Sequence, residues 1–140
     1  MTGLVALLAA LAATGVVAWA FKLRSGRFAD AAPDVEVLSP ADIGADLGER
    51  ATLVQFSSAF CSPCRATRVL LTDVASKIDG IVTVDIDAEK HLDLVRRFNI
   101  MRTPTVLVLD AQGTVTTRAS GLPRREQVLV ALGQAVGDPR

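Results

Sequence analysis

The sequence predicts an α/β domain with a mixed central β-sheet flanked by helices, preceded by one apolar N-terminal helix. Strand-like and helix-like runs alternate along most of the chain, in the order β-α-β-α-β-α-β-β-α. This alternation favours parallel strands joined by helices, whereas two strand-like runs near the C-terminus, separated by a short turn, predict an antiparallel pair. The third observation is an uncharged stretch from Gly3 to Phe21 that precedes all of these runs.

Length and charge limit the function classes. The chain has 140 residues, with 15 basic and 15 acidic side chains and a formal net charge of zero. This length allows one sizeable core, and the balanced charge argues against a general nucleic-acid binder. We therefore expect an anchor at residues 1–24, a linker at 25–34 and one domain at 35–140.

The uncharged stretch fits a transmembrane helix. As a helix it would span roughly 28 Å at about 1.5 Å per residue, close to the hydrocarbon thickness of a bilayer. Trp19 suits an interfacial anchor. The alternative is a cleaved signal peptide, with Ala18-Trp19-Ala20 as a possible cleavage site. A signal peptide begins with basic residues, however, and here none precedes the stretch while Lys22 follows it.

The flanking charges also predict an orientation. Lys22, Arg24 and Arg27 all lie on the C-terminal side of the stretch. Positively charged flanks remain on the cytoplasmic side of a membrane. We therefore expect a single-pass protein with its domain on the cytoplasmic face, and an extracytoplasmic domain is the alternative.

The first half of the domain is expected to contain two strands and two helices. A strand is predicted at Val35–Leu38. A helix then begins at Pro40, capped by Ser39, and ends near Gly48. The apolar run Thr52–Phe56 fits a buried strand. The following run, from Arg65 to Ile78, has apolar residues at helical spacing, namely Val69, Leu70, Val74 and Ile78.

The second half is expected to complete the sheet. β-Branched residues predict a strand at Ile81–Ile86, after the turn signal Asp79-Gly80. Asp87 could cap a helix over Ala88–Phe98, with Leu92, Val95 and Phe98 as its apolar stripe. The turn Asp110–Gly113 joins the two strands Thr105–Leu109 and Thr114–Ala119. The closing helix is predicted from Pro123 to Val136, with Val128, Leu129, Leu132 and Val136 on one side.

Both cysteines of the chain lie where a strand passes into a helix. Cys61 and Cys64 are separated by two residues, the second of which is Pro63. The first helical turn presents unpaired N–H groups and the positive end of the helix dipole, which stabilise a thiolate relative to a thiol. Cys61 is therefore the predicted nucleophile and Cys64 the resolving thiol, with supporting positive charge from Arg65 and Arg68.

The cysteine pair has two alternative uses, a structural zinc site and a structural disulfide. A structural zinc site needs four ligands, and His91 is the one histidine or cysteine outside the pair. A purely structural disulfide across two residues would close too small a loop to gain much entropy. Pairing of His91 with a catalytic cysteine is conceivable, although it lies on another predicted helix. Redox chemistry without a metal fits the residues best.

The motifs together resemble the thioredoxin family. Phe60-Cys61-Ser62-Pro63-Cys64 follows a strand, and Arg102-Thr103-Pro104-Thr105 precedes a later one. The resemblance covers about Val35 to Gly137. It implies a thioredoxin fold with a redox-active Cys61–Cys64 disulfide, and substrate contacts from Phe60, Ser62 and Pro63.

The resemblance also assigns roles outside the cysteine loop. Pro104 is implied to be a cis-proline beside the cysteines, and the backbone of Thr103 to bind an extended substrate segment. The alternative is a trans proline that opens an edge strand. Gly121 matches a family glycine that leaves space for the substrate, and the alternative is a turn that ends a strand.

Two positions depart from the family pattern. Phe60 stands where thioredoxins usually have tryptophan, and so lacks an indole N–H donor. Gln55 stands where they commonly bury an aspartate that moves a proton to or from the resolving cysteine. Because Gln55 cannot titrate, proton transfer at Cys64 must use water or another group.

These observations predict a membrane-anchored thiol–disulfide oxidoreductase that reduces protein disulfides. The resemblance implies an electron donor such as a thioredoxin reductase, and no bound cofactor or metal. One alternative is an extracytoplasmic oxidase or a reductase for cytochrome maturation. A third reading is a non-catalytic thioredoxin-like binding module.

Overall fold

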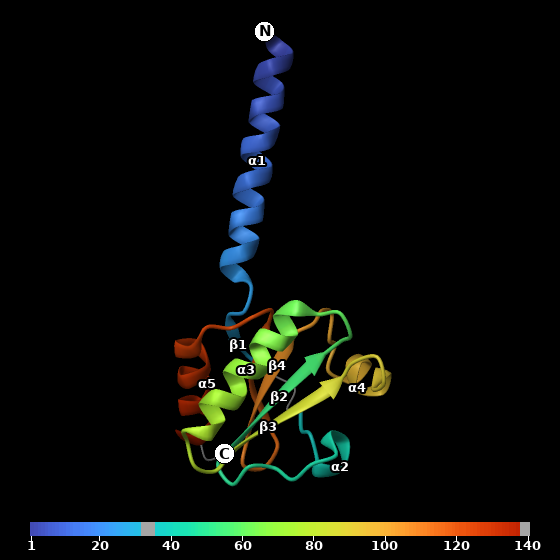
Figure 1. Cartoon of the computed structure of the whole chain (residues 1–140), viewed down its shortest axis with the longest axis vertical. Coiled ribbons are helices and arrows are strands. Elements are labelled where there is room, and N and C mark those ends of the chain that lie inside the picture. Colours follow the sequence, from blue (N-terminus) through green and yellow to red (C-terminus); the bar gives the residue numbers. More distant parts are fainter. Residues whose placement is uncertain (32–35, 138–140) are drawn as a thin grey trace.

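The computed structural model describes residues 1–31 and 36–137, and it separates one long helix from a domain (Figure 1). The helix α1 (Thr2–Arg24) contains an 18-residue stretch with a mean hydropathy of 2.3, and none of its residues is buried by the rest of the chain. It is long and apolar enough to span a membrane, a property that signal sequences share.

The domain is built on a five-stranded sheet in the order β1-β5-β4-β2-β3. Its strands are β1 (Phe28–Asp30), β2 (Ala51–Ser57), β3 (Ile81–Asp87), β4 (Thr105–Asp110) and β5 (Val115–Ser120). The pair β2–β3 is parallel, and the other neighbouring pairs are antiparallel. The predicted fold class, a mixed sheet flanked by helices, is confirmed.

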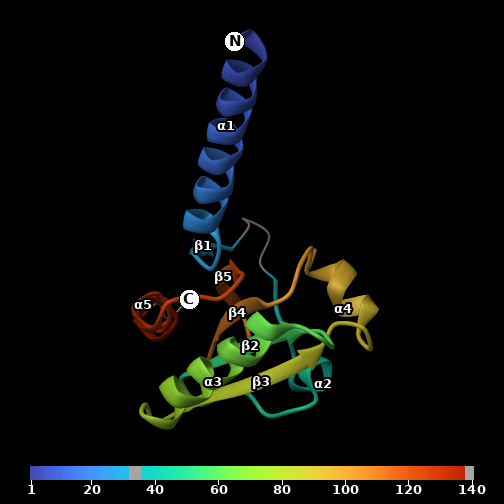
Figure 2. The ribbon, with the colours of Figure 1, turned by 45° about the horizontal axis from the view of Figure 1, so that its top comes forward.

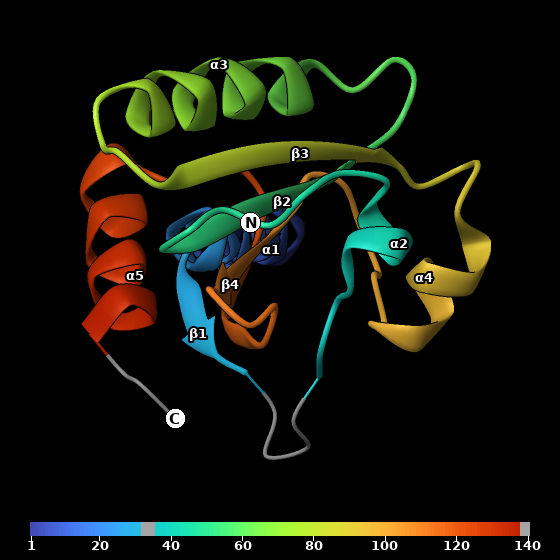
Figure 3. The same ribbon diagram turned by 90° about the horizontal axis from the view of Figure 1, so that it is seen from below.

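Helices cover both faces of this sheet (Figures 2 and 3). The helices are α2 (Pro40–Ile43), α3 (Ser62–Ser76), α4 (Leu92–Arg97) and α5 (Arg125–Gly137). Leu71 of α3 and Leu132 of α5 belong to one buried apolar cluster, and Ile43 of α2 and Leu94 of α4 belong to another. The two clusters share the central strands β2 and β4, which are buried along their whole length. A strand with helices on both sides has no solvated face, which is why these runs are mostly apolar rather than alternating.

The first strand lies elsewhere than expected. β1 lies within the predicted linker and pairs antiparallel with β5 through Phe28 and Ala119. Of the predicted strand at Val35–Leu38, Val35 lies outside the described residues, and Val37 forms an isolated bridge with Thr114. An exposed edge such as that of β5 offers unpaired backbone groups to any extended segment, so a short stretch without a strand-like pattern can pair with it.

Two helices are shorter than predicted. α2 ends at Gly44, which adopts the left-handed conformation that terminates helices (φ 66°), four residues before Gly48. α4 begins at Leu92 rather than Ala88, because Asp87 accepts a bond from the backbone N–H of Glu89 in a turn before the helix.

The arrangement sets the position of the cysteine loop. β2 and β3 run in parallel and end on the side of the domain from which α1 leaves, and α3 begins at that same end (Figure 1). The segment that joins β2 to α3 therefore faces the end of α1.

Candidate functional site

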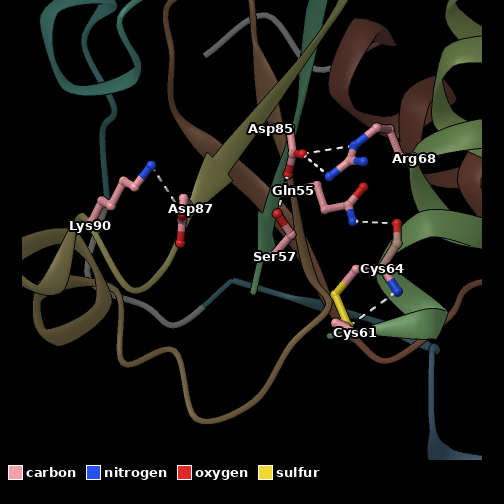
Figure 4. A network of polar contacts seen from close by, with 8 residues as sticks. All are labelled: Gln55, Ser57, Cys61, Cys64, Arg68, Asp85, Asp87 and Lys90. Atoms are coloured by element: carbon pink, nitrogen blue, oxygen red, sulfur yellow. Dashed lines mark hydrogen bonds and ion pairs between the residues drawn. A yellow bond between two sulfur atoms is a disulfide. The ribbon is translucent and has the colours of Figure 1, made fainter. Parts of the chain in front are cut away.

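Cys61 and Cys64 form a disulfide at the start of α3 (Figure 4). The S–S distance is 2.00 Å and the two Cα atoms are 5.2 Å apart. Cys61 is the N-cap residue, and its Sγ accepts a 3.2 Å hydrogen bond from the backbone N–H of Cys64. Cys61 is half-buried, whereas Cys64 is only 2% exposed. An external molecule can therefore reach the sulfur of Cys61 more readily than that of Cys64.

The loop before the disulfide carries an exposed aromatic ring. Phe60 has a positive φ of 59° and is fully exposed. A bulky residue in this backbone region is uncommon and marks a constrained turn. Its ring does not pack over the disulfide, and is available to a bound partner.

The second predicted motif forms the turn before β4. The Thr103–Pro104 peptide bond is cis. The Thr103 hydroxyl is 2.9 Å from that of Ser58, which precedes the cysteine loop, and the Thr105 hydroxyl donates a 2.6 Å bond to the Arg102 carbonyl. The hydroxyl contact ties the proline turn to the segment that leads into the disulfide.

Five of the predicted site residues line one groove of about 890 Å³, namely Ser62, Pro63, Thr103, Pro104 and Gly121. Phe60, Cys61 and Cys64 are not among the lining residues, so the groove lies beside the disulfide rather than over it. The groove also receives residues that sequence reasoning did not assign to the site, including Trp19, Lys22 and Leu23 of α1. No local pattern links α1 to the cysteine loop, because the two segments meet only in the folded chain.

Beneath the disulfide lies an uncharged polar contact. Gln55 is 2% exposed, and its side-chain N–H donates a 2.8 Å hydrogen bond to the Cys64 carbonyl. The residue beside it on β3 is Asp85. Asp85 accepts a 2.6 Å bond from the Ser57 hydroxyl and pairs with Arg68 of α3 (Figure 4). Arg68, expected to support Cys61, is thus engaged by a carboxylate that sequence reasoning missed.

His91 takes no part in this network. It is exposed at the start of α4, with Nδ1 3.0 Å from the carbonyl oxygen of Asp87. Across residues 1–31 and 36–137, no three His, Cys, Asp or Glu side chains gather in a way that could hold a metal ion.

Comparisons with known proteins match this geometry. A model of the Thioredoxin family matches residues 35–132. Thioredoxin domain-containing protein 2 of Homo sapiens is 30% identical over 98 residues, which cover 68% of this chain and 18% of that protein. Mitochondrial thioredoxin of Bos taurus is 28% identical over 90 residues, which cover 64% of this chain and 54% of that protein. The aligned part of the chain thus spans about half of the bovine relative and a smaller share of the human one.

Solved structures agree on the fold. Chloroplastic thioredoxin z aligns with a TM-score of 0.56 and 23% identity, covering 64% of this chain and 81% of that one. A mutant thioredoxin from Halobacterium salinarum aligns with a TM-score of 0.58 and 18% identity, covering 71% and 84%. The fold together with a cysteine pair at disulfide distance supports thiol–disulfide oxidoreductase chemistry. The family match covers most of the chain, and the protein belongs to the thioredoxin family.

Proposed function

We propose that the protein is a membrane-anchored thiol–disulfide oxidoreductase that acts mainly as a reductase of protein disulfides. The observation that carries this proposal is the unequal exposure of the two sulfurs. Cys61 is half-buried at the mouth of the site, and Cys64 is 2% exposed beneath it. A reductase needs one sulfur that meets the substrate and a second that is kept for the resolving step.

The reaction has two exchange steps. With the pair reduced, the Cys61 thiolate attacks one sulfur of a substrate disulfide, and the displaced substrate thiolate takes up a proton. Cys64 then loses its proton and attacks the Cys61 sulfur, which breaks the mixed disulfide and releases the second substrate thiol. Two electrons have passed to the substrate, and the Cys61–Cys64 disulfide remains. The N–H of Cys64 that points at the Cys61 sulfur would stabilise its thiolate in the first step.

The groove supplies the substrate contacts in this proposal. The backbone of Thr103, before Pro104, would hydrogen-bond an extended segment of the substrate. Ser62 and Pro63 would form the facing wall, since both are exposed and line the same groove. Phe60 would pack on substrate atoms outside the groove. No bound cofactor is needed, because a dithiol donor such as a thioredoxin reductase would regenerate the reduced pair.

Membrane attachment is the second part of the proposal. α1 exposes apolar side chains along its whole length, and lipid would cover them. Lys22, Arg24 and Arg27 at its C-terminal side favour a cytoplasmic domain. A C-terminal reporter that is active only in the cytoplasm tests this orientation. Silence of the reporter would favour the extracytoplasmic alternative.

The reduction potential of the Cys61–Cys64 pair is the direct test of the activity. The full chain in detergent would be equilibrated with glutathione redox buffers and its thiols counted. We expect a value around −270 mV, as for thioredoxin itself. A value near −120 mV would make the protein an oxidant, and the lack of any reversible couple would favour a binding module.

A further inference from the structure

The end of the anchor helix forms one side of the groove beside the redox loop. The groove is lined from α1 by Trp19, Lys22 and Leu23 and, across from them, by Ser62 and Pro63. Figures 1 and 2 show the end of α1 directly above β1 and β5, on the side of the domain where α3 begins. Cys61 does not itself line the groove, but Ser62 and Pro63, which follow it in the chain, do. A substrate bound at Cys61 that extends over these two residues therefore also meets the anchor.

Close packing fixes the anchor at this place. Gly26 donates a 2.6 Å backbone hydrogen bond to Ser120, and with a φ of 76° any Cβ on it would lie 2.0 Å from the Leu122 carbonyl oxygen. Arg102 hydrogen-bonds Ser25, and its guanidinium lies 5.6 Å from the centre of the Phe21 ring. The segment after α1 is thus docked on the domain by backbone and side-chain contacts, and β1 continues it into the sheet.

The same docking fills the space above Gly121. A Cβ at this glycine would lie 2.6 Å from the Ser25 hydroxyl and 2.7 Å from the Arg102 guanidinium. The space that the family resemblance assigns to substrate is occupied here by the chain's own juxtamembrane segment. A substrate must instead lie along that segment, between it and the redox helix.

The groove is positively charged. Its charged lining residues are Lys22, Arg27, Arg102 and Arg124, and no acidic residue among those that the structure describes lines it. Within residues 1–31 and 36–137, none of the ion pairs includes any of these four cations. A low-dielectric cleft lined by one sign of charge attracts a ligand of the opposite sign.

We infer that the groove selects disulfides flanked by acidic residues, on proteins held at the same membrane surface. This inference rests on the proposed reductase function and names its substrate class. Two features carry it: four cations without a paired acid, and an anchor wall that places the groove beside the bilayer. The acidic segment lies against the cations while Cys61 attacks the neighbouring disulfide, by the two exchange steps given above.

The test compares two probe peptides that differ only in charge. Each carries one intramolecular disulfide, flanked by glutamates in one peptide and by lysines in the other. The full chain is reduced, freed of reductant and held in phosphatidylcholine nanodiscs, and single-turnover reduction is followed at low salt. We expect the acidic peptide to react roughly tenfold faster or more, because steering of this kind raises association rates by about 10–10³. The difference should shrink at high salt.

Two triple variants locate the effect. The groove variant combines three substitutions, Lys22→Gln, Arg27→Gln and Arg124→Gln. It should reduce the two peptides at similar rates. The matched control replaces three exposed cations outside the groove, Arg50→Gln, Lys90→Gln and Arg96→Gln, and should keep the preference. An unchanged preference in the groove variant would overturn the inference and leave lipid phosphates as the partners of these cations.

A small neutral disulfide, bis(2-hydroxyethyl) disulfide, separates the two proposals. Every variant should reduce it at the wild-type rate, since it needs no charged contact. Equal rates for the two peptides, with normal reduction of this probe, would overturn the inference alone. If the wild-type protein reduced none of the three disulfides, the proposed function would be overturned, and the inference with it.

Discussion

Two regions of the redox site differ in charge: the floor, formed by Gln55 beneath Cys64, and the mouth, which is the groove beside the disulfide. On the floor, Gln55 is 2% exposed and makes a neutral hydrogen bond to the Cys64 carbonyl. At the mouth, the groove is lined by four cations and, within the described part of the chain, by no acid. The comparison indicates a division of tasks, in which the buried side holds the resolving cysteine in place and the open side carries the charge that a substrate meets.

An amide avoids the free-energy cost of burying a charge on the floor. An ionised carboxylate at position 55 would lose its hydration and face a carbonyl oxygen, which cannot donate to it. An amide keeps the hydrogen bond without that cost. The carboxylate of this region lies instead on the neighbouring strand, where Asp85 is partly exposed and paired with Arg68. The division therefore follows solvent access.

The largest expected effect comes from the cysteines themselves. Cys61→Ser should abolish disulfide reduction, because no thiolate then faces the substrate. Cys64→Ser should keep the first exchange step and accumulate mixed disulfides through Cys61, since the resolving step is lost. Non-reducing gel electrophoresis with mass spectrometry would identify the trapped adducts. Failure of Cys64→Ser to trap any disulfide partner would contradict the roles proposed for the two sulfurs.

A charge on the floor should change both rate and stability. Gln55→Asp introduces a carboxyl whose pKa burial raises, so it becomes ionised only as the pH rises. A folded-state pKa above the unfolded one means that stability falls as the pH increases through that range. We expect about 1–3 kcal/mol less stability than wild type at pH 8 and a smaller loss at pH 5.

The pH dependence of the reduction rate tests whether residue 55 takes part in proton transfer. The rate of bis(2-hydroxyethyl) disulfide reduction by Gln55→Asp should gain an inflection between pH 5 and 9, because the new carboxyl can exchange a proton near Cys64. Gln55→Asn introduces a side chain as long as that of Asp but without a titratable group, and it should lack the inflection. Identical pH profiles for the Asp and Asn variants would mean that the floor takes no part in proton transfer.

A methyl group at the mouth tests the docking of the anchor. Gly121 has a φ of 94°, and a Cβ there would meet Ser25 and Arg102. Gly121→Ala should destabilise the domain by about 1–3 kcal/mol, the cost of a strained left-handed residue, and should slow reduction of the acidic peptide. Gly133→Ala is the matched control, because it lies in α5 with nothing within 4 Å of its Cβ. It should stabilise the protein by about 0.5–1 kcal/mol, and urea denaturation in detergent measures both.

The sequence was informative where one local pattern decides the structure. The buried strand before Cys61, the helix after it and the hairpin between Asp110 and Gly113 follow from apolar runs and turn residues. The sequence did not predict which residues of α3 face the sheet. Val69, expected in its apolar stripe, is 67% exposed, whereas Leu71 is buried. Both are apolar and two positions apart, so periodicity alone does not say which faces the sheet.

Local sequence patterns did not predict the contacts at the mouth of the site. Ser25 and Arg102 meet across 77 positions of the chain, and nothing in either segment marks the contact. β1 is three residues long and lacks an alternating pattern, so an available edge on β5 decides its structure. Gln55 could be identified as a departure from the family, but its bond to the Cys64 carbonyl depends on how α3 packs over β2.

The smallest expected effect lies far from both sides of the site, at the start of α2 (Figure 1). Ser39 and Asp42 form a capping box, in which the Ser39 hydroxyl accepts a bond from the Asp42 N–H and the Asp42 carboxylate accepts from the Ser39 N–H. Ser39→Ala should cost about 1 kcal/mol of stability, as at other helix N-caps. It should leave reduction of every disulfide unchanged, because α2 contributes nothing to the groove.

The pH dependence of this cap can be derived from its hydrogen bonds. The Ser39 backbone N–H, followed by its hydroxyl, lowers the pKa of Asp42 below its usual value. A carboxyl with a depressed folded-state pKa adds stability that is fully present above the unfolded pKa, about 3.9, and is lost as the pH falls through the folded value. Asp42→Asn should therefore be less stable than wild type at pH 7, and the difference should shrink below about pH 4. A difference that stayed constant over that range would assign the effect of Asp42 to packing rather than to its charge.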